Sequence, residues 1–525
     1  MLEGLRQPPD VVHVITTIFM VNWSIVEYCG LSEKSRCGYC KNTRQRASLG
    51  EEDGNNADEG HSYSFGCFGH VIDGENFMRL LEYGWSGVRR ESSPKRSFIA
   101  GIWALRLSCA NYQNFLDKGW RRSGKYMYKP TMERTCCPQY TIRLDSSKFI
   151  LSRSQRRVLR EMNLFLKNDT KPRNAVREEA PVETKNASSS VRNEMKDARE
   201  MSDRKNAENP RSMSKKKEIR RQRCFERWRA KGLDVEEMKR ARALKEEARR
   251  RTVESYIMEP DSTWKHKLEV KLVSTSSELF RERYDESYLL YEKYQKIIHK
   301  DDDPSKAGFK RFLVDSPLFD DEPSSPGVLR TGSYHQWYLL DGKLIAVGVV
   351  DILPRCVSSK YLYYDPDYAF LSLGTYTALR EIAFTRYVMK QRPEAKYYYM
   401  GYYISTCPKM RYKGKFRPSE LLCDRTFQWV PLDVCDRMLQ NNCNNFTVFL
   451  PDLPPAEMQT RDQLLLLIDG KIVSYADIEE LMPSLKEVAE SDVVKEKLDE
   501  FASRIGCDVN NLIIYLSDLQ GFEPV

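Results

Sequence analysis

The segment from Ser333 to Cys423 constrains the fold most, because it is the densest run of apolar, aromatic and small residues in the chain. Asp341-Gly342 separates an aromatic run at 334–339 from a β-branched run at 344–353. An Asp-Gly pair between apolar runs predicts a hairpin. The second run is apolar throughout, which is typical of a strand that is buried on both faces.

A strand, a loop of small residues and a helix are predicted to follow this hairpin. Residues 359–364 favour a strand, and apolar residues at helical spacing over 376–388 predict a helix that packs one face on the sheet. Ser372, Gly374 and Thr375 lie where this helix begins. The first N–H groups of a helix lack intrahelical partners, so this loop is a candidate site for an anionic ligand.

This order of elements resembles the core of a GCN5-related acyltransferase. Several long residue blocks are similar to a narrower family, the arginyl-tRNA–protein transferases. The blocks are Tyr361-Leu362-Tyr363-Tyr364-Asp365-Pro366-Asp367-Tyr368, Phe370-Leu371-Ser372-Leu373-Gly374, Ala378 to Arg386, Tyr399 to Ile404 and Cys407-Pro408-Lys409-Met410-Arg411-Tyr412-Lys413-Gly414. The resemblance covers residues 20–167 and 264–432.

The resemblance implies an α+β fold and a tRNA-dependent enzyme. The enzyme would transfer arginine from arginyl-tRNA to the N-terminal α-amine of proteins that begin with Asp, Glu or oxidised Cys. Ubiquitin ligases would recognise the product and direct its degradation. The donor ester is already activated, so no ATP is needed, and the sequence has no P-loop.

Two cysteine pairs predict a metal site in a cysteine-rich N-terminal domain. Cys37 and Cys40 form a Cys-x-x-Cys motif, and Cys136-Cys137 follows about a hundred residues later. Four thiolates suit tetrahedral zinc or an iron–sulfur cluster, although Cys136 and Cys137 could also be small buried apolar residues. Both motifs match the family, and that match implies an iron–sulfur cluster, with zinc as the alternative.

A segment between the cysteine pairs occurs twice, at 66–85 and at 101–120. Each copy predicts a short strand and a helix that ends at Gly-Trp. Only the second copy continues as Trp120-Arg121-Arg122-Ser123-Gly124, as the family does. We interpret the repeat as a duplicated exon or as a gene model that fuses two alternative exons.

Composition changes along the chain predict its domain organisation. Lys, Arg, Glu, Asn and Ser dominate 168–262, which is typical of a partly disordered linker, with a solvated helix over 236–251. The basic run at 215–223 resembles a nuclear-import or RNA-attracting segment. The predicted parts are an extension at 1–19, the N-terminal domain at 20–167, the linker at 168–262, a catalytic domain at 263–435 and a helical C-terminal appendage at 436–525.

Charge and hydropathy narrow the classes of partner. The net charge of +9 favours a polyanionic partner. No segment reaches the 18 to 20 apolar residues of a membrane helix, so we expect no membrane partner. We predict a cytoplasmic protein with a nuclear pool.

The matched blocks supply the candidate site residues, each with a structural alternative. Asp351 and Glu381 are equally suited to structural roles. The segment from Trp120 to Pro130 could instead be a solvated basic hairpin, and the loop after Cys407 could be a basic surface loop. The catalytic candidates are Asp351, Glu381, Tyr364, Tyr402 and His335. The substrate-binding candidates are Trp120, Arg121, Arg122, Lys129, Asp365, Asp367, Ser372, Gly374 and Thr375, and the tRNA-binding candidates are Lys409, Arg411 and Lys413.

Two other functions are compatible with parts of the sequence. An acetyltransferase that uses acetyl-CoA would share the core, but its pyrophosphate loop needs a second glycine that Leu371 to Thr375 lacks. A non-catalytic, metal-dependent RNA-binding adaptor would account for the cysteines and the basic charge. It would not account for the aromatic blocks of the core.

Overall fold

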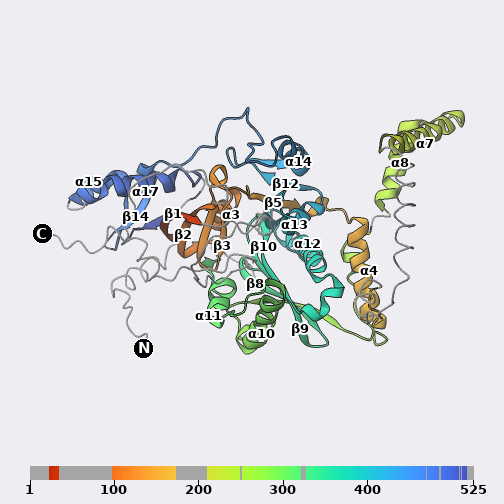
Figure 1. Ribbon diagram of the computed structural model, residues 1–525, viewed down its shortest axis with the longest axis horizontal. Helices are drawn as coiled ribbons and strands as arrows, with labels where there is room; N and C mark the ends of the chain where they lie inside the picture. The colour runs from red at the N-terminus through yellow and green to blue at the C-terminus, as the bar shows by residue number, and fades with distance from the viewer. Residues whose placement is uncertain are drawn as a thin grey trace, which may run out of the picture. The chain divides into compact units, whose positions relative to one another are not determined.

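The computed structural model describes residues 23–34, 97–172, 210–248, 251–320, 327–468, 470–483, 486–507, 509 and 511–516 (Figure 1). The predicted extension at 1–19, the thiols of Cys37 and Cys40, and the first repeat copy at 66–85 lie outside these residues. The chain up to Thr170 and from Glu259 onward belongs to one compact unit, and Lys171–Met258 forms a second.

The first unit contains two mixed sheets, each with parallel and antiparallel pairs, which agrees with the α+β prediction. The first sheet has the order β15 (Lys471–Ser474), β14 (Leu465–Ile468), β16 (Leu512–Tyr515), β1 (Ser24–Lys34), β2 (Ser97–Ser108), β4 (Tyr126–Pro130), β3 (Arg121–Ser123), and β7 (Leu318–Phe319) pairs with β2. The second has the order β13 (Trp429–Pro431), β12 (Ser419–Leu422), β5 (Tyr140–Asp145), β11 (Tyr397–Tyr403), β10 (Cys356–Tyr364), β9 (Lys343–Ile352), β8 (Gly332–Leu340), β6 (Leu268–Ser274).

The predicted hairpin is the β8–β9 pair of the second sheet. Asp341 and Gly342 have φ values of +51° and +85°, as a tight two-residue hairpin turn requires. Alternate residues of β9 face opposite layers, and Figure 1 shows the strand among its neighbours. Val347 and Val349 belong to one apolar cluster, and Val350 belongs to another. The prediction that this strand is buried on both faces is confirmed.

Helices supply those two layers. The helix α10 (Tyr284–Tyr294) packs on the Val347 side, and α12 (Leu373–Gln391) contributes Val388 to the Val350 side. The other helices of this unit are α3 (Cys109–Asp117), α4 (Arg153–Asn168), α9 (Glu278–Glu282), α11 (Lys306–Phe309), α13 (Pro408–Arg411), α14 (Leu432–Asn441), α15 (Ile478–Leu481), α16 (Lys486–Ala489) and α17 (Asp492–Ala502).

The parallel strands β10 and β11 pair along only part of their length. Pairing joins Cys356–Ser358 of β10 to Tyr397–Tyr399 of β11, although β10 continues to Tyr364. Past the residues that pair with β10, the strand β11 still pairs with β5 through Tyr402 and Tyr403. The two strands therefore splay apart beyond Ser358 and Tyr399, and α12 connects them. Membership of the GCN5-related fold remains a prediction.

The second repeat copy folds as its sequence predicts, into β2 followed by α3. The helix ends in a Schellman motif, in which Trp120 N–H donates to Phe115 O at 3.0 Å and Gly119 N–H donates to Leu116 O at 3.1 Å. Gly119 has a φ of +91°, a conformation that glycine adopts at little cost. The ring of Trp120 then packs edge-on against Phe115. This geometry explains the Gly-Trp ending.

The two sheets of the first unit contain strands from more than one of the predicted parts of the chain. The N-terminal segment is not a separate domain, because β5 lies between β11 and β12 of the second sheet. The C-terminal segment is not purely helical, because β14 and β16 extend the first sheet beside β1. The run at 464–468 is five apolar residues long, and periodicity cannot distinguish a strand from a helix at that length.

The second unit is a helical hairpin in its described part. The helices are α7 (Pro210–Ala230) and α8 (Val235–Ala248), so the predicted helix over 236–251 is confirmed as far as Ala248. Gly232 has a φ of +68° and ends α7, with Leu233 N–H donating to Trp228 O at 3.0 Å. Across both units, none of the described helices is long and apolar enough to cross a membrane.

The C-terminal strands and α17 should be needed for the stability of the first sheet. Phe501 of α17 is fully buried, and its ring lies 5.1 Å from that of Tyr28 on β1. Phe501→Ala should lower the free energy of unfolding by about 3–5 kcal/mol, because it leaves a cavity in the core. Val493→Ala is a control on the same helix at an exposed position, and it should change stability by less than about 0.5 kcal/mol. Urea unfolding measures both, and equal effects would contradict this packing.

Candidate active site

Arg122 and Asp351 form a buried ion pair between the two sheets. Arg122 lies on β3, and Asp351 lies on β9. The guanidinium donates from Nε to Oδ2 at 2.8 Å and from Nη2 to Oδ1 at 2.5 Å, so the pair is bidentate. Ser333 Oγ donates to the same carboxylate at 2.9 Å. The predicted substrate-binding arginine and the predicted catalytic carboxylate therefore bind each other.

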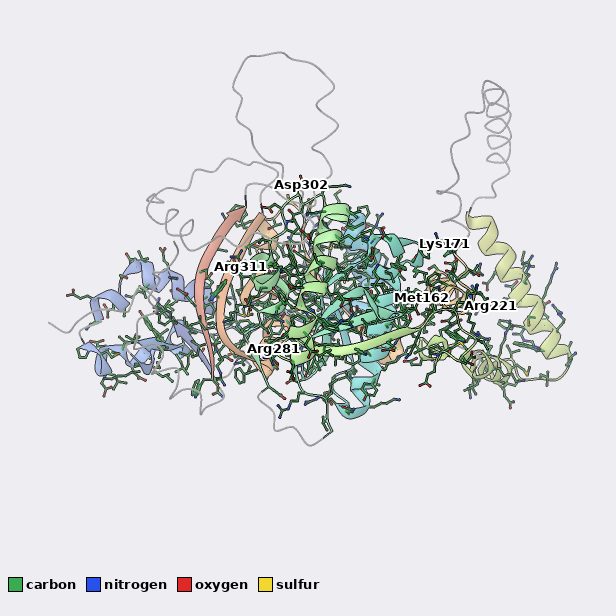
Figure 2. The ribbon with its side chains drawn as sticks, turned by 90° about the horizontal axis from the view of Figure 1, so that it is seen from below. Met162, Lys171, Arg221, Arg281, Asp302 and Arg311 are labelled. Atoms are coloured by element: carbon green, nitrogen blue, oxygen red, sulfur yellow. The ribbon has the colours of Figure 1, made fainter. Side chains whose placement is uncertain are left out.

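The turn between β3 and β4 helps to hold this arginine. Arg122 Nη1 donates to the carbonyl oxygen of Gly124 at 2.9 Å, and Gly124 N–H donates to Phe312 O at 3.1 Å. Gly124 has a φ of +62°, and a Cβ atom there would collide with the carbonyl oxygen of Arg311, which Figure 2 labels. Only glycine fits this turn without strain.

Two more basic side chains lie close to the pair: His335 is buried and Lys360 is half-buried. Burial lowers the pKa of His335 to about 4, so its imidazole is neutral at pH 7. Its Nε2 lies 3.1 Å from Leu313 O. Burial, with a smaller contribution from the charge of Arg122, also holds the pKa of Lys360 well below its usual value. The Lys360 amine donates to Phe312 O at 2.8 Å.

Arg121 and Tyr402 connect the β3–β4 hairpin to β11. Arg121 donates to Trp120 O at 2.7 Å, and its guanidinium carbon lies 5.3 Å from the ring centre of Tyr402. The Tyr402 hydroxyl donates to Gly119 O at 2.8 Å. The indole N–H of Trp120 donates to Arg504 O at 3.1 Å, which ties this turn to the C-terminal segment. All three predicted site residues are buried and make structural contacts.

Lys129, the remaining basic candidate of this hairpin, faces the β12–β13 connection. Its ammonium lies 3.3 Å from Asp424 Oδ1 and 4.7 Å from the ring centre of Phe427. Burial lowers the pKa of Lys129, although the nearby Asp424 opposes this effect. Arg121, Arg122 and Lys129 of this hairpin are therefore buried, and each contacts a carboxylate or a carbonyl oxygen, which contradicts the solvated alternative for these three cations.

Glu381 of α12 points into the sheet beneath the splayed strands. The hydroxyl of Tyr398 on β11 donates to Glu381 Oε2 at 2.6 Å. Gly348 of β9 leaves room for the other carboxylate oxygen, because a Cβ atom there would collide with it. Burial raises the pKa of Glu381 to about 7, although hydrogen bonds from Tyr398 and Ser359 oppose the rise. A carboxyl group with this pKa can both accept and release a proton near neutral pH.

Asp365 and Asp367 lie at the start of the short 3₁₀ helix Pro366–Leu371. Lys293 of α10 bridges them, at 2.6 Å from Asp365 Oδ1 and 2.7 Å from Asp367 Oδ2, and Lys343 lies 3.0 Å from Asp365 Oδ2. Burial opposes ionisation of Asp365, but the two lysines outweigh it and lower its pKa. Tyr364 is half-buried beside them, and burial raises its pKa.

The start of α12 has the expected geometry of a tight turn. Ser372 is exposed, with a φ of +54°, and Thr375 N–H donates to its carbonyl oxygen at 2.9 Å. A Cβ atom on Gly374 would lie 3.9 Å from Leu362, an ordinary contact distance. The small residues therefore permit the turn, and an anionic ligand here remains a prediction.

The three tRNA-binding candidates share one short segment but differ in exposure. Lys409 and Arg411 lie on α13 and are exposed. Lys413 follows in the 3₁₀ helix Tyr412–Lys415 and is half-buried, with its ammonium donating to Tyr402 O at 2.7 Å. Two of the three cations are thus available to a phosphate, and the third secures the segment to β11.

The described part of the predicted metal site contains one cysteine pair. Cys137 is buried in a small cluster with Ile404 and Cys407, whereas Cys136 is exposed. Among the described residues, no group of three or more Cys, His, Asp or Glu side chains could hold a metal ion. These two thiols alone do not fit a cluster, and the other predicted ligands lie outside the described residues.

Several residues of these groups were not predicted, among them Tyr398, Lys293 and Lys360. Lys360 carries a usable signal, since it is a lysine within the aromatic strand run 359–364. Tyr398 lies on β11 and Lys293 lies on α10, and no local sequence pattern indicates which acid each would meet.

The two halves of the chain match two models of one family. The models are described as Arginine-tRNA-protein transferase, N terminus, at residues 35–157, and C terminus, at residues 286–423. The arginyl-tRNA–protein transferase 1 of Drosophila melanogaster is 34% identical over 470 residues, which cover 80% of this chain and 95% of that protein. This chain belongs to the arginyl-tRNA–protein transferase family.

Other relatives match smaller shares of this chain. The arginyl-tRNA–protein transferase 2 of Arabidopsis thaliana is 34% identical over 446 residues, covering 66% of this chain and 74% of that protein. The aspartate/glutamate leucyltransferase of Stutzerimonas stutzeri is 37% identical over 151 residues, covering 28% of this chain and 56% of that protein. The chain is therefore an arginyltransferase, with arginyl-tRNA as donor and protein as acceptor. The sequence-based recognition is confirmed.

Replacing Glu381 should remove a pH dependence of stability. The folded pKa lies above the ordinary value of 4.5, so the folded protein keeps a proton that the unfolded chain releases. The contribution of Glu381 is full at pH values below the unfolded pKa and falls by about 3 kcal/mol as the pH rises through 7. Glu381→Gln should therefore flatten the fall in stability between pH 5 and 8, as urea unfolding would show.

The exposed Glu394→Gln is the control for this experiment and should keep the slope of the wild type. If Glu381→Gln also kept that slope, Glu381 would not hold an extra proton in the folded protein.

Proposed function

We propose that this arginyltransferase selects acceptor proteins that begin with Asp, Glu or oxidised Cys, and that its product is recognised by ubiquitin ligases for degradation. The observation that carries the arginyl transfer is the match over 95% of the Drosophila relative. The choice of acidic acceptors is supported by the relatives named aspartate/glutamate leucyltransferases, which align with part of this chain.

The reaction makes one bond and breaks one. The acceptor's α-amine nitrogen attacks the carbonyl carbon of the arginyl ester, an amide forms, and the ester C–O bond to the tRNA breaks. The enzyme must hold both reactants together, accept a proton from the ammonium group and stabilise the oxyanion.

Glu381 is the residue best suited to accept that proton. A base is most effective when its pKa lies near the working pH, and the pKa of Glu381 is about 7. The other candidates suit the role less well. The pKa of about 4 leaves His335 a weak base, and both oxygens of Asp351 are bound by Arg122. We assign Asp351 to positioning Arg122 and the β3–β4 hairpin.

The remaining candidates fit binding roles of different kinds. Asp367 is exposed and pairs with Lys293 through Oδ2 alone, so its Oδ1 can accept from the guanidinium of the arginyl group, whereas both oxygens of Asp365 are held by lysines. Lys409 and Arg411 are exposed and suit the phosphates of the tRNA 3′ end. Ser372, Gly374 and Thr375 could bind another phosphate at the start of α12.

An iron–sulfur cluster on Cys37, Cys40, Cys136 and Cys137 is also part of the proposal, with zinc as the alternative. It rests on the two cysteine motifs and on their match to the family. We propose no chemical step through the metal. The protein would act in the cytoplasm, with a nuclear pool.

To test this proposal, the protein is purified without oxygen and incubated with tRNA that carries radiolabelled arginine. Peptides that begin with Asp, Glu or Met are offered as acceptors in parallel reactions. Label on the Asp and Glu peptides should exceed label on the Met peptide by more than about tenfold, and Glu381→Gln should lower the rate by about 10²–10⁴. Glu394→Gln should keep the wild-type rate.

Equal labelling of the three peptides would contradict the proposed specificity. If RNA bound but no peptide was labelled, the non-catalytic adaptor would be the better account. If Glu381→Gln kept the wild-type rate, another group would have to accept the proton.

A further inference from the structure

The helix α7 presents three arginines on one face. Arg220, Arg223 and Arg227 are spaced by three and four residues, so their side chains form one stripe along the helix. All three are exposed. The stripe extends over eight residues, which is seven helical steps or about 10 Å of helix axis. Figure 2 labels Arg221, their neighbour on the same helix.

The opposite face of α7 is occupied within the hairpin. Phe225 lies roughly 140–160° around the helix from the three arginines. Its ring contacts Trp228, with ring centres 5.7 Å apart, and the ammonium of Lys239 on α8 lies 4.7 Å from its ring centre. The arginine stripe is therefore directed away from the contact between α7 and α8.

The part of the chain that the structure describes offers the stripe no carboxylate partner. Among the residues that the structure describes, none forms an ion pair with Arg220, Arg223 or Arg227. Arg227 Nε donates only to a backbone oxygen, that of Arg223, at 3.2 Å. The pattern in α8 differs, since that helix has four basic and four acidic residues and pairs Lys239 with Glu236 at 2.6 Å.

We propose that the stripe on α7 binds the phosphate backbone of the tRNA donor. Arginine binds phosphate through two parallel hydrogen bonds, and a row of unpaired cations matches a polyanion in charge. The hairpin belongs to the separate compact unit Lys171–Met258, so it supplies a surface beyond the residues assigned to the transfer reaction. A phosphate contact of this kind increases affinity without reading sequence.

The full-length protein tests this directly by its binding of uncharged tRNA. One variant combines Arg220→Gln, Arg223→Gln and Arg227→Gln, and the matched control combines Arg240→Gln, Arg242→Gln and Lys245→Gln on α8. Both remove three exposed positive charges and introduce glutamine, a good helix former. Far-UV circular dichroism verifies that each variant is folded. Binding is measured by fluorescence anisotropy with labelled tRNA between 50 and about 300 mM KCl.

The α7 variant should bind tRNA at least about tenfold more weakly at low salt. Its slope of log K against log salt concentration should fall by about 2–3, as expected for three lost phosphate contacts. The α8 control should keep a slope close to that of the wild type.

Equal losses in the two variants would overturn the proposal, because net charge alone would then explain the binding. An unchanged slope in the α7 variant would show that the stripe is merely solvated. If tRNA binding was unchanged but the protein no longer reached the nucleus, an acidic import receptor would be the partner instead. The binding measurement needs no transfer activity, so it stands apart from the test of the reaction.

Discussion

The buried pair of Arg122 and Asp351 is the contact on which the arrangement of the two sheets depends. Removing two charges from water is costly, and the cost is offset here by a bidentate geometry and by the hydroxyl of Ser333. The pair joins β3 of the first sheet to β9 of the second. The aromatic and basic groups that surround the candidate active site come from both sheets, and this contact and the apolar core that the sheets share hold them in place.

Strand pairing between distant segments explains why the chain does not divide into an N-terminal and a catalytic domain. The strand β5 comes from the N-terminal half but pairs with β11 and β12, and the C-terminal strand β16 pairs with β1. Trp120 donates to the backbone of Arg504, so the turn before β3 also rests on the C-terminal segment. Distant parts of the sequence must therefore fold together before the site exists.

Local sequence patterns predicted the elements well and their partners poorly. The Asp341-Gly342 turn, the strand buried on both faces and the helix α12 all follow from short-range rules of turn chemistry and periodicity. The pairing of Arg122 with Asp351 joins residues that are 229 positions apart, which no local pattern encodes. Burial sets the raised pKa of Glu381 and the lowered pKa of His335, and it becomes known only when the sheets are assembled.

A double-mutant cycle on the two residues tests the central role of the ion pair most directly. Arg122→Gln and Asp351→Asn are made singly and together, and the free energy of unfolding is measured with urea. Each single change should cost about 3–5 kcal/mol, because it leaves a buried charge without its partner. The double change should cost less than the sum by more than about 2 kcal/mol. Additive effects would show that the pair does not hold the two sheets together.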